Sequence, residues 1–552
     1  MQHRLATVVA ASAVFTLSLV RTQTAHADHL ISDWNLIAID EIKAQGGTAA
    51  GPNAATRALA IVHLAIYDTV AAFDKSHRPY LVELDAPEEA SVEAAVAGAA
   101  YYTLVVLLPA RRTALNQRLN DALDAAPGAQ DTIDNGYDFG VEVADRILAS
   151  RAGDGSATVQ IDAGSSKLGK WRPISANAAD AALEPAWRYV RPFAISKPSA
   201  FRPSKPPKLG TSAYIAAVEE VRALGGSAAT AVTTVTRTSE QTLIADFWKQ
   251  PTHIPFSAIA RQVVNARDLT LEESARFFAQ LSIALADSRI AAWDAKYEFD
   301  FWRPYHAIRS DDGNAQRSTG TTLDAAWTPY LPTPAHPEYP SGHSTTSAAA
   351  AAVLSTWFGE DVGFTVASDS LTGVTRSFAS FRGASEENGR SRIYGGIHYQ
   401  FANAAGQTLG AKVGHYVTDV LFSSVDVADP RIDPDDDAGV PPFDAGTSTA
   451  GSGGASAGAG GSAGSAGSVA DPKDAGVADA SRPVPGRPDA SSAERDGGPP
   501  PYVADAGDVD DSDSDDGCSC SVPGARVSAA GGLRSLALIG LALLVMSRRR
   551  RG

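Results

Sequence analysis

The stretch Pro340-Ser-Gly-His343 is followed at once by a run of helix-forming residues. The backbone N–H groups at a helix start have no partner inside the helix and lie at the positive end of its dipole, so they form a ready site for an oxyanion. Gly342 would let a ligand approach the backbone without a Cβ in the way. His343 would then stand beside the anion, with a side chain suited to proton transfer near neutral pH. The alternative is a Ser-capped helix with a histidine on its surface.

Two further stretches add cations and a second histidine. Upstream, six residues separate Lys296 from Arg303-Pro304, and downstream five residues separate Ser391-Arg392 from His398. A buried, multiply charged anion is costly unless several cations and neutral donors surround it. Two guanidinium forks, one ammonium group and the donors of the first stretch would meet that requirement. The His398 imidazole would then be the group that reaches the central atom of the anion.

In this order and spacing, the three stretches resemble the signature of the vanadium-dependent haloperoxidases and of their relatives, the type 2 phosphatidic acid phosphatases and bacterial acid phosphatases. The resemblance extends over residues 275–309, particularly the run AAWDAKYEFDFWRP, and to the order of helices in the N-terminal half. It implies an all-α helical bundle with two catalytic histidines, His343 and His398. It also implies that vanadate or phosphate is held by Lys296, Arg303, Ser341, Gly342 and Arg392.

The resemblance leaves two reactions open on the same pocket. As a vanadate-dependent haloperoxidase, the protein would bond the metal to His398 and oxidise a halide with hydrogen peroxide to hypohalous acid, while His343 moves the proton and the metal acts as a Lewis acid. As a secreted phosphohydrolase, it would cleave a phosphate ester through a phospho-histidine at His398, without a metal. We expect the haloperoxidase, because the likeness extends beyond the motifs. A non-catalytic surface protein on an inherited fold is a third hypothesis.

Two aromatic side chains bear on the choice of halide. His336 stands where fungal chloroperoxidases carry Phe and algal bromoperoxidases carry His, whereas Trp293 matches the chloroperoxidases. The mixture favours bromide, and the alternative is that both side chains simply pack in the pocket. The family also implies an acidic partner for the histidine that binds vanadium. No acid stands at the matching offset after Trp248, so we consider Asp246 and Asp287 as substitutes.

The elements that must position these residues are predicted to be helices. His63 and Tyr67, four residues apart on one of them, are interpreted as core polar groups, and Thr270 with Glu273 predicts a capping box. Residues 151–212 read as an irregular segment that shapes the entrance of the pocket. Apolar periodicity and helix-end residues predict helices over 32–43, 55–73, 88–108, 131–150, 212–224, 239–248, 270–289, 290–302, 348–358, 371–384 and 404–422. Glu88 and Glu89 are assigned to a first helical turn, residues 385–391 to a turn, and residues 393–401 to a helix start or tight turn around His398.

Composition divides the rest of the chain. Residues 1–27 resemble a secretory signal with an A-x-A cleavage site, the alternative being an anchor that is not removed. Residues 28–425 are the predicted catalytic domain, with its N-terminal helices ending near residue 230. Residues 426–517 hold 20 acidic and 5 basic residues in a Gly-, Ala-, Ser- and Pro-rich context, which predicts a disordered linker. The order of Cys518, Cys520, an apolar run and terminal arginines in residues 518–552 resembles myxobacterial sorting tags, the alternative being a plain transmembrane anchor.

Charge and apolar runs limit the partners. The formal net charge is −16, and residues 28–425 carry −9 of it, which argues against nucleic acid. No run of 18 consecutive apolar residues occurs in that range, so membrane contact is expected only through the C-terminal segment. The two cysteines both lie in the tail, so the catalytic domain has no disulfide. We expect an exported protein that is secreted or held at the cell surface, and a homo-oligomer is possible.

Overall fold

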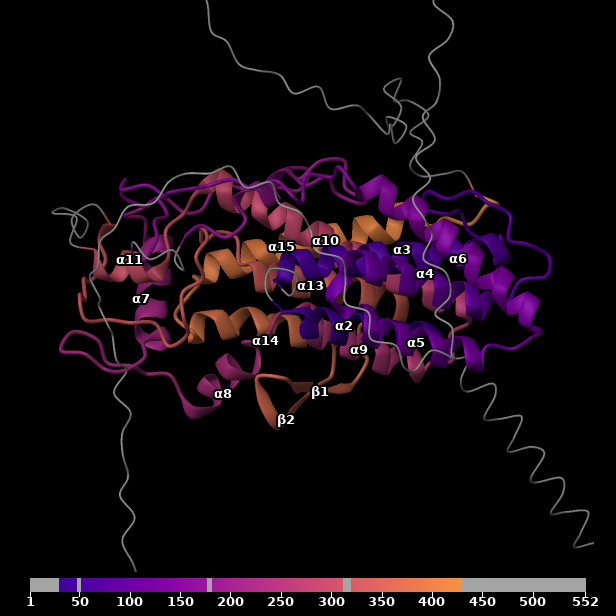
Figure 1. Ribbon diagram of the computed structural model, residues 1–552. Helices are drawn as coiled ribbons and strands as arrows, with labels where there is room; N and C mark the ends of the chain where they lie inside the picture. The colour runs from indigo at the N-terminus through magenta and orange to yellow at the C-terminus, as the bar shows by residue number, and fades with distance from the viewer. Residues whose placement is uncertain (1–28, 47–50, 176–180, 311–318, 428–552) are drawn as a thin grey trace, which may run out of the picture. The chain divides into compact units, whose positions relative to one another are not determined.

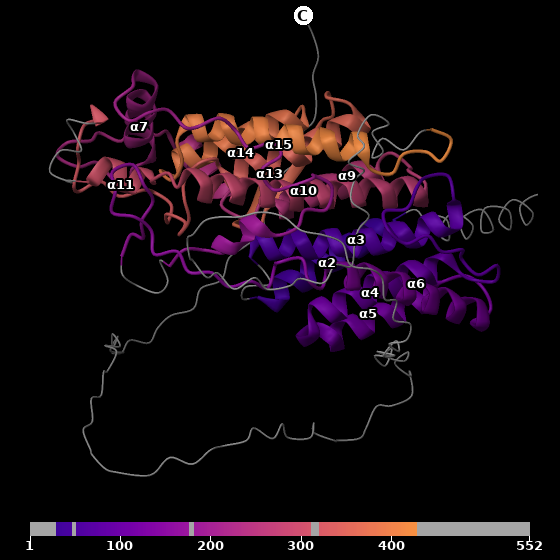
Figure 2. The same cartoon turned by 90° about the horizontal axis from the view of Figure 1, so that it is seen from above.

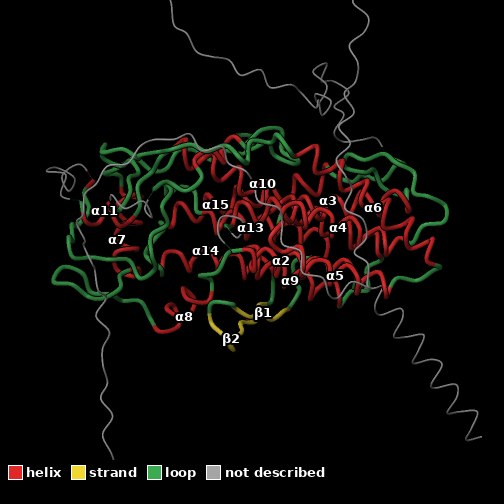
Figure 3. The backbone as a smooth tube through the Cα atoms, in the orientation of Figure 1, coloured by secondary structure: helices red, strands yellow, loops and turns green. Residues whose placement is uncertain are grey.

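The computed structural model describes residues 29–46, 51–175, 181–310 and 319–427 (Figure 1). The predicted signal, linker and sorting segments lie outside these residues and stay predictions. The all-α prediction is confirmed, with one small hairpin added (Figure 3). The elements are α2 (Leu30–Gln45), α3 (Pro52–Asp74), α4 (Val92–Leu107), α5 (Arg112–Ala125), α6 (Gln130–Arg151), α7 (Ser212–Gly225), α8 (Ser239–Phe247), α9 (His253–Asn265), α10 (Leu271–Phe299), α11 (Pro304–Arg309), α13 (Gly342–Phe358), β1 (Phe364–Ser368), β2 (Leu371–Phe378), α14 (Phe381–Tyr394) and α15 (Gln400–Val420).

The helices form two groups that pack side by side, one N-terminal and one C-terminal. In Figure 2, α4, α5 and α6 lie on one side and α14 and α15 on the other, with α3 and α10 between them. Helix α10 packs against α3 in the N-terminal group and against α13 and α15 in the C-terminal group. Helices α7 and α11 pack together at one end of the molecule. In the C-terminal half, α10, α14 and α15 thus pack around α13, whereas α11 lies with α7.

Helix α10 is one continuous helix where two adjoining segments were predicted. Its capping box is confirmed, because the Thr270 side chain accepts from the N–H of Glu273 and the Glu273 carboxylate accepts from the N–H of Thr270. The helix ends after 29 residues, at Asp300, whose φ of 49° takes the chain out of the helix. Small and apolar residues predominate over residues 277–297, where every position of the helix is buried.

Glycines bring α13 and α15 into close contact. Gly406, Gly410 and Gly414 stand four residues apart and so lie on one face of α15. A Cβ added at these three positions would lie 2.7, 2.0 and 2.5 Å from the backbone oxygens of Ser341, Thr345 and Ala349. No side chain larger than hydrogen fits there unless the helices separate. This seam sets the position of the first turn of α13, which carries the PSGH residues.

Several predicted elements were wrong. The predicted helix over 371–384 is instead β2, which pairs antiparallel with β1, followed by α14, whose N-cap is Ser380. The β-branched and aromatic residues of the β1–β2 pair favour strand over helix. The predicted turn over 385–391 lies inside α14. Glu88 and Glu89 precede α4, which is capped by Ser91 and carries Glu93 in its first turn. Helices α5, α9 and α11 were not predicted.

The irregular segment after α6 is tied to the helical groups by buried polar contacts, as predicted for an ordered loop. It contains a 3-10 helix, η4 (Pro185–Tyr189). The Asp287 carboxylate on α10 accepts three backbone N–H groups from residues 193–195 at 2.7, 2.7 and 3.0 Å. These bonds dock the segment on the helix that carries Lys296.

Helix α3 is a core helix. By length and composition it could cross a membrane, but 89% of its most apolar window is buried inside the protein. His63 on this helix lies 2.9 Å from the Asn35 amide nitrogen, and the Tyr67 hydroxyl donates to the Arg78 carbonyl at 2.8 Å. Both are buried, which confirms their interpretation as core polar groups.

Candidate active site

The three motif stretches meet in one buried region. Lys296 lies in the last turn of α10, Arg303 caps α11, Ser341 caps α13 and Arg392 lies in the last turn of α14. His398 follows the turn through residues 395–396 and stands two residues before α15. Each of these five side chains is at most 3% exposed. Four helix ends and one loop therefore deliver cations, a hydroxyl and an imidazole to the same interior.

The Lys296 ammonium holds the segment that leads into α13. Its Nζ donates to the carbonyl oxygens of Pro337 and Glu338 at 3.0 Å each and of Pro340 at 2.6 Å. All three of its hydrogens are therefore used by the backbone. Burial and the neighbouring Arg303 lower the pKa of Lys296 well below its ordinary value, while Glu338 opposes the shift. An anion beside this group would favour its charged form.

His398 is held in one tautomer by two neighbours. Its Nδ1 lies 2.7 Å from Oε1 of Glu338, and its Nε2 lies 3.2 Å from Nη1 of Arg303. A guanidinium has only donors, so Nε2 accepts and the ring proton is on Nδ1, which donates to Glu338. Burial and the charges of Arg303 and Lys296 lower the pKa of His398, which favours the neutral ring. Nε2 therefore carries a lone pair suited to attack phosphorus or to bond a metal.

Glu338, and neither Asp246 nor Asp287, is the acidic partner of His398. Asp246 accepts from the Tyr330 hydroxyl at 2.7 Å and Asp287 binds backbone N–H groups, so neither serves His398. Glu338 stands only three residues before Ser341, inside the motif stretch itself, where its carboxylate could have been noticed. Burial raises its pKa to about 7, although Arg303 and Lys296 act in the opposite direction.

The start of α13 has free donors, as predicted. The Ser341 hydroxyl caps the helix by accepting from the N–H of Ser344. Among the described residues, no acceptor is bonded to the backbone N–H of Gly342 or His343. The His343 side chain is partly exposed, and its Nε2 lies 3.3 Å from the Gln250 carbonyl oxygen. Burial, followed by the nearby charges of Arg392 and Arg289, lowers the pKa of His343.

The two side chains predicted to choose the halide also come together. The rings of Trp293 and His336 lie 4.9 Å apart between centroids. Nδ1 of His336 lies 2.9 Å from Nη2 of Arg303, and the Nε of that arginine donates to the His336 backbone oxygen at 2.9 Å. His336 thus borders the same guanidinium that contacts His398, and Trp293 lies against His336.

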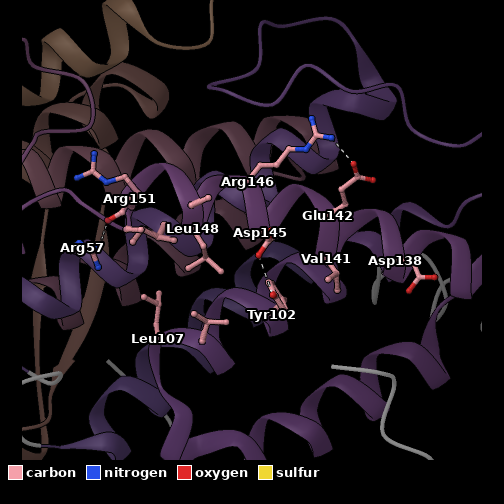
Figure 4. A pocket seen from close by; sticks show the side chains of 14 residues that line it. Arg57, Tyr102, Leu107, Asp138, Val141, Glu142, Asp145, Arg146, Leu148 and Arg151 are labelled. Atoms are coloured by element: carbon pink, nitrogen blue, oxygen red, sulfur yellow. Dashed lines mark hydrogen bonds and ion pairs between the residues drawn. The ribbon is translucent and has the colours of Figure 1, made fainter. Parts of the chain in front are cut away.

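A small hollow borders Arg303. It has a volume of about 10 Å³ and is lined by Arg303, His306, residues 171–174 and residues 333–335. The first of these loops belongs to the irregular segment that was predicted to shape the entrance. A much larger cavity of about 890 Å³ lies between α3, α4 and α6 (Figure 4). None of the candidate site residues lines that cavity, so the chemistry is not located there.

The charge balance of the site fits a bound oxyanion. Lys296, Arg303 and Arg392 are joined by a fourth buried cation, Arg289, which was missed although it stands two helical turns before Lys296 on α10. Burial lowers the pKa of Arg392 to about 9, so it stays charged at neutral pH. The negative charge set against these four cations is the Glu338 carboxylate, which contacts His398. A buried excess of positive charge beside free N–H donors is stabilised by an anion.

The fold and the site are those of a helical enzyme in which a carboxylate-oriented histidine faces a cluster of buried cations. Residues 276–426 match the family model of the VCPO second helical-bundle domain. A vanadium chloroperoxidase of Curvularia inaequalis is 26% identical, and the match covers 66% of this chain and 77% of that protein. By these matches the chain is similar to the vanadium-dependent haloperoxidases.

Solved structures agree with this assignment. The crystal structure of a bacterial vanadium-dependent iodoperoxidase superposes with a TM-score of 0.60 and is 26% identical, covering 71% of this chain and 97% of that one. A holo-type bacterial vanadium-dependent chloroperoxidase has a TM-score of 0.53 and 19% identity, covering 68% of this chain and 95% of that one. At that identity the second likeness shows the fold alone.

Proposed function

We propose that this protein is a vanadate-dependent haloperoxidase that oxidises a halide, with bromide preferred, by hydrogen peroxide to hypohalous acid. One observation carries the proposal: Glu338 holds the ring proton of His398 on Nδ1, so Nε2 is unprotonated inside a cluster of buried cations. Such a cluster matches vanadate, an oxyanion whose five-coordinate form resembles a phosphoryl-transfer transition state. The haloperoxidase relatives support the reaction class.

Each candidate site residue has a distinct part in this proposal. Lys296, Arg303, Arg392, Ser341 and the N–H of Gly342 would hold vanadate, and Nε2 of His398 would be its protein ligand. When bound, vanadate would supply a Lewis acid that activates hydrogen peroxide without a change in oxidation state. Because its pKa is lowered, His343 is neutral near pH 7, so its ring can accept a proton at the site and return it. Trp293 and His336 would border the halide.

A phosphohydrolase is the second candidate, and the His398–Glu338 pair is the observation that favours it. A neutral imidazole whose Nδ1–H is held by a carboxylate is also suited to attack phosphorus and form a phospho-histidine. His343 would then protonate the leaving alcohol.

The two candidates are separated by assaying one preparation in two ways. We expect peroxide-dependent bromination of an organic acceptor after incubation with orthovanadate, faster with bromide than with chloride at equal concentration. Vanadium should be retained by the wild-type protein and lost from His398→Ala. Release of phosphate from an aryl phosphate ester, with no peroxide-dependent halogenation by any halide, would instead establish the phosphohydrolase.

We also propose that the protein is exported and remains tethered through residues 518–552. The signal-like N-terminus, the acidic Gly- and Ala-rich linker and the terminal arginines support this location. Deletion of residues 518–552 should release the catalytic domain into the medium, and retention of the deleted form with the cells would contradict the tether.

A further inference from the structure

Arg289 lies beside the candidate site and has no assigned role. It precedes Trp293 by four residues and Lys296 by seven, so the three side chains share one face of α10. Arg289 is 6% exposed, and its Cζ lies 4.3 Å from the centre of the Trp293 ring. Its Nε donates to the Asn53 side-chain oxygen at 2.7 Å. The guanidinium is therefore stacked on one side and anchored at one nitrogen.

The other two nitrogens of this guanidinium have no protein partner. Among the described residues, no acceptor is bonded to Nη1 or Nη2, and no carboxylate lies within 4.0 Å. The acid Glu184 is reached only indirectly, through the Asn53 amide that donates to it at 2.7 Å. A buried guanidinium with two unused donor groups is costly unless an anion completes it.

The unused end is directed toward the start of α13. A Cβ added at Gly342 would lie 3.1 Å from Nη1 of Arg289 and 3.8 Å from Cε of Lys296. The unpaired N–H of Gly342 and the free nitrogens of Arg289 therefore border the same space. The charge of Arg289 also contributes to the lowered pKa values of His343, Lys296 and His336, as a cation inside the site would.

Lys296 and Arg303 have fewer donors to spare. All three hydrogens of Lys296 are donated to backbone oxygens. Arg303 uses its Nε, Nη1 and Nη2 on His336, residue 397 and His398. These two residues supply positive potential while most of their hydrogen bonds are spent on the scaffold. Arg289 supplies donors that these two residues lack, as does Nη1 of Arg392, whose bonds among the described residues are donated by Nε and Nη2.

We propose that Arg289 is a further anion-binding residue of this site, donating Nη1–H and Nη2–H to the bound oxyanion beside the N–H of Gly342. Asn53 holds the remaining nitrogen and Trp293 supports the plane of the group. The inference deepens the proposed function, because vanadate is the oxyanion of that proposal. It applies equally to phosphate, since both are tetrahedral anions that accept from a planar fork.

The test measures anion affinity rather than turnover. Isothermal titration calorimetry with orthophosphate, and separately with orthovanadate, is carried out on the full chain at pH 7 without peroxide. Arg289→Met should bind both anions about 10- to 100-fold more weakly, the loss of charge-assisted hydrogen bonds. Arg289→Lys should recover only part of the affinity and remain at least about threefold weaker, because lysine lacks the planar fork.

Arg276→Met is the matched control. Arg276 is on the same helix, its Cζ lies 4.7 Å from the centre of the Trp357 ring, and its Nε donates to Glu272 at 2.9 Å. It repeats the stacking and anchoring of Arg289 away from the site, so its replacement should leave anion affinity unchanged. Thermal unfolding of each variant checks that the comparison is made between folded proteins.

The outcomes separate this inference from the proposed function. If the wild-type protein binds neither anion, the proposed function fails. If it binds them and folded Arg289→Met binds them equally well, only the role of Arg289 is overturned. Should the methionine variant not fold, Arg289→Lys decides: a weaker affinity supports the role, and wild-type affinity overturns the two-donor contact.

Discussion

At the scale of single residues, the reactivity of the site depends on which nitrogen of His398 carries the proton. Glu338 accepts from Nδ1 and Arg303 can only donate to Nε2, so the two neighbours favour the same tautomer. A metal-binding or nucleophilic histidine oriented by a carboxylate is more basic and better aligned than a free one. The same carboxylate accepts from the N–H of Tyr399 at 3.0 Å, which ties the loop to the segment before α13.

Replacement of this carboxylate should weaken anion binding without unfolding the protein. In Glu338→Gln the amide can donate to Nδ1 of His398 and so shift the ring proton to Nε2. We expect vanadium retention to fall about 10- to 100-fold, the usual effect of losing such a partner. Metal analysis after dialysis measures it. Glu360→Gln, an exposed residue just after α13, is the control, and full retention in Glu338→Gln would refute the orienting role.

At the scale of elements, the position of the oxyanion cradle depends on the glycine seam between α13 and α15. The seam places backbone against backbone along two and a half turns, so the first turn of α13 cannot shift independently. The ends of α10 and α14 then approach this turn with Lys296 and Arg392. Rigid helix ends, rather than flexible loops, thus carry most of the cations, which reduces the reorganisation needed when an anion binds.

A methyl group in the seam tests this dependence. In Gly410→Ala the new Cβ would lie 2.0 Å from the backbone oxygen of Thr345, so the helices must separate. We expect a loss of about 3 kcal/mol in the free energy of unfolding, typical of overpacking against backbone, together with weaker phosphate binding. Urea unfolding and calorimetry measure the two effects. Gly153→Ala, which has open space around it, should change neither, and wild-type stability in Gly410→Ala would argue against a rigid seam.

At the scale of the whole molecule, a buried charge cluster joins the N-terminal helices to the segment beside the site. The Asp154 carboxylate lies 2.7 Å from Nε of Arg57 on α3 and 2.8 Å from Nη2 of Arg151 on α6. The guanidinium of Arg151 in turn stacks on the Phe193 ring at 3.8 Å. Residue 193 is also bound by Asp287 of α10, so the cluster links both helical groups.

This cluster predicts a loss of stability in acid. Burial tends to raise the pKa of Asp154, but Arg57 and Arg151 outweigh it, so the pKa is lowered in the folded state. The resulting stabilisation is complete above the unfolded pKa of about 4 and is lost as the pH falls below it. Asp154→Asn should therefore reduce the free energy of unfolding by roughly 3 kcal/mol at pH 7 and by less near pH 3.

Urea unfolding at both pH values checks this prediction. Asp85→Asn removes the carboxylate of a surface pair with Lys75, 2.6 Å apart and exposed on both sides, and should have little effect. An equal effect of Asp154→Asn at pH 7 and pH 3 would show that its charge does not stabilise the fold.

The sequence by itself determined the all-α architecture of the catalytic domain, most helix positions and the cations, hydroxyl and histidines of the site. These properties follow from local signals: periodicity, caps, and residue types at fixed spacing. It failed at residues 371–384, which were predicted to form a helix although residues 371–378, with Thr372, Val374 and Thr375, form β2.

Only the tertiary structure decided which groups meet. Glu338 reaches His398 across 60 positions, and Asn53 anchors Arg289 across 236. Such partners depend on the way α3, α10, α13 and α15 pack. The periodicity of one segment does not show which side chain of a distant segment its own side chains will meet. The spare donors of Arg289 became visible only when the hydrogen bonds of Lys296 and Arg303 could be counted. The residue types required for anion chemistry are thus a property of the chain, whereas the donors left free for an anion are a property of the fold.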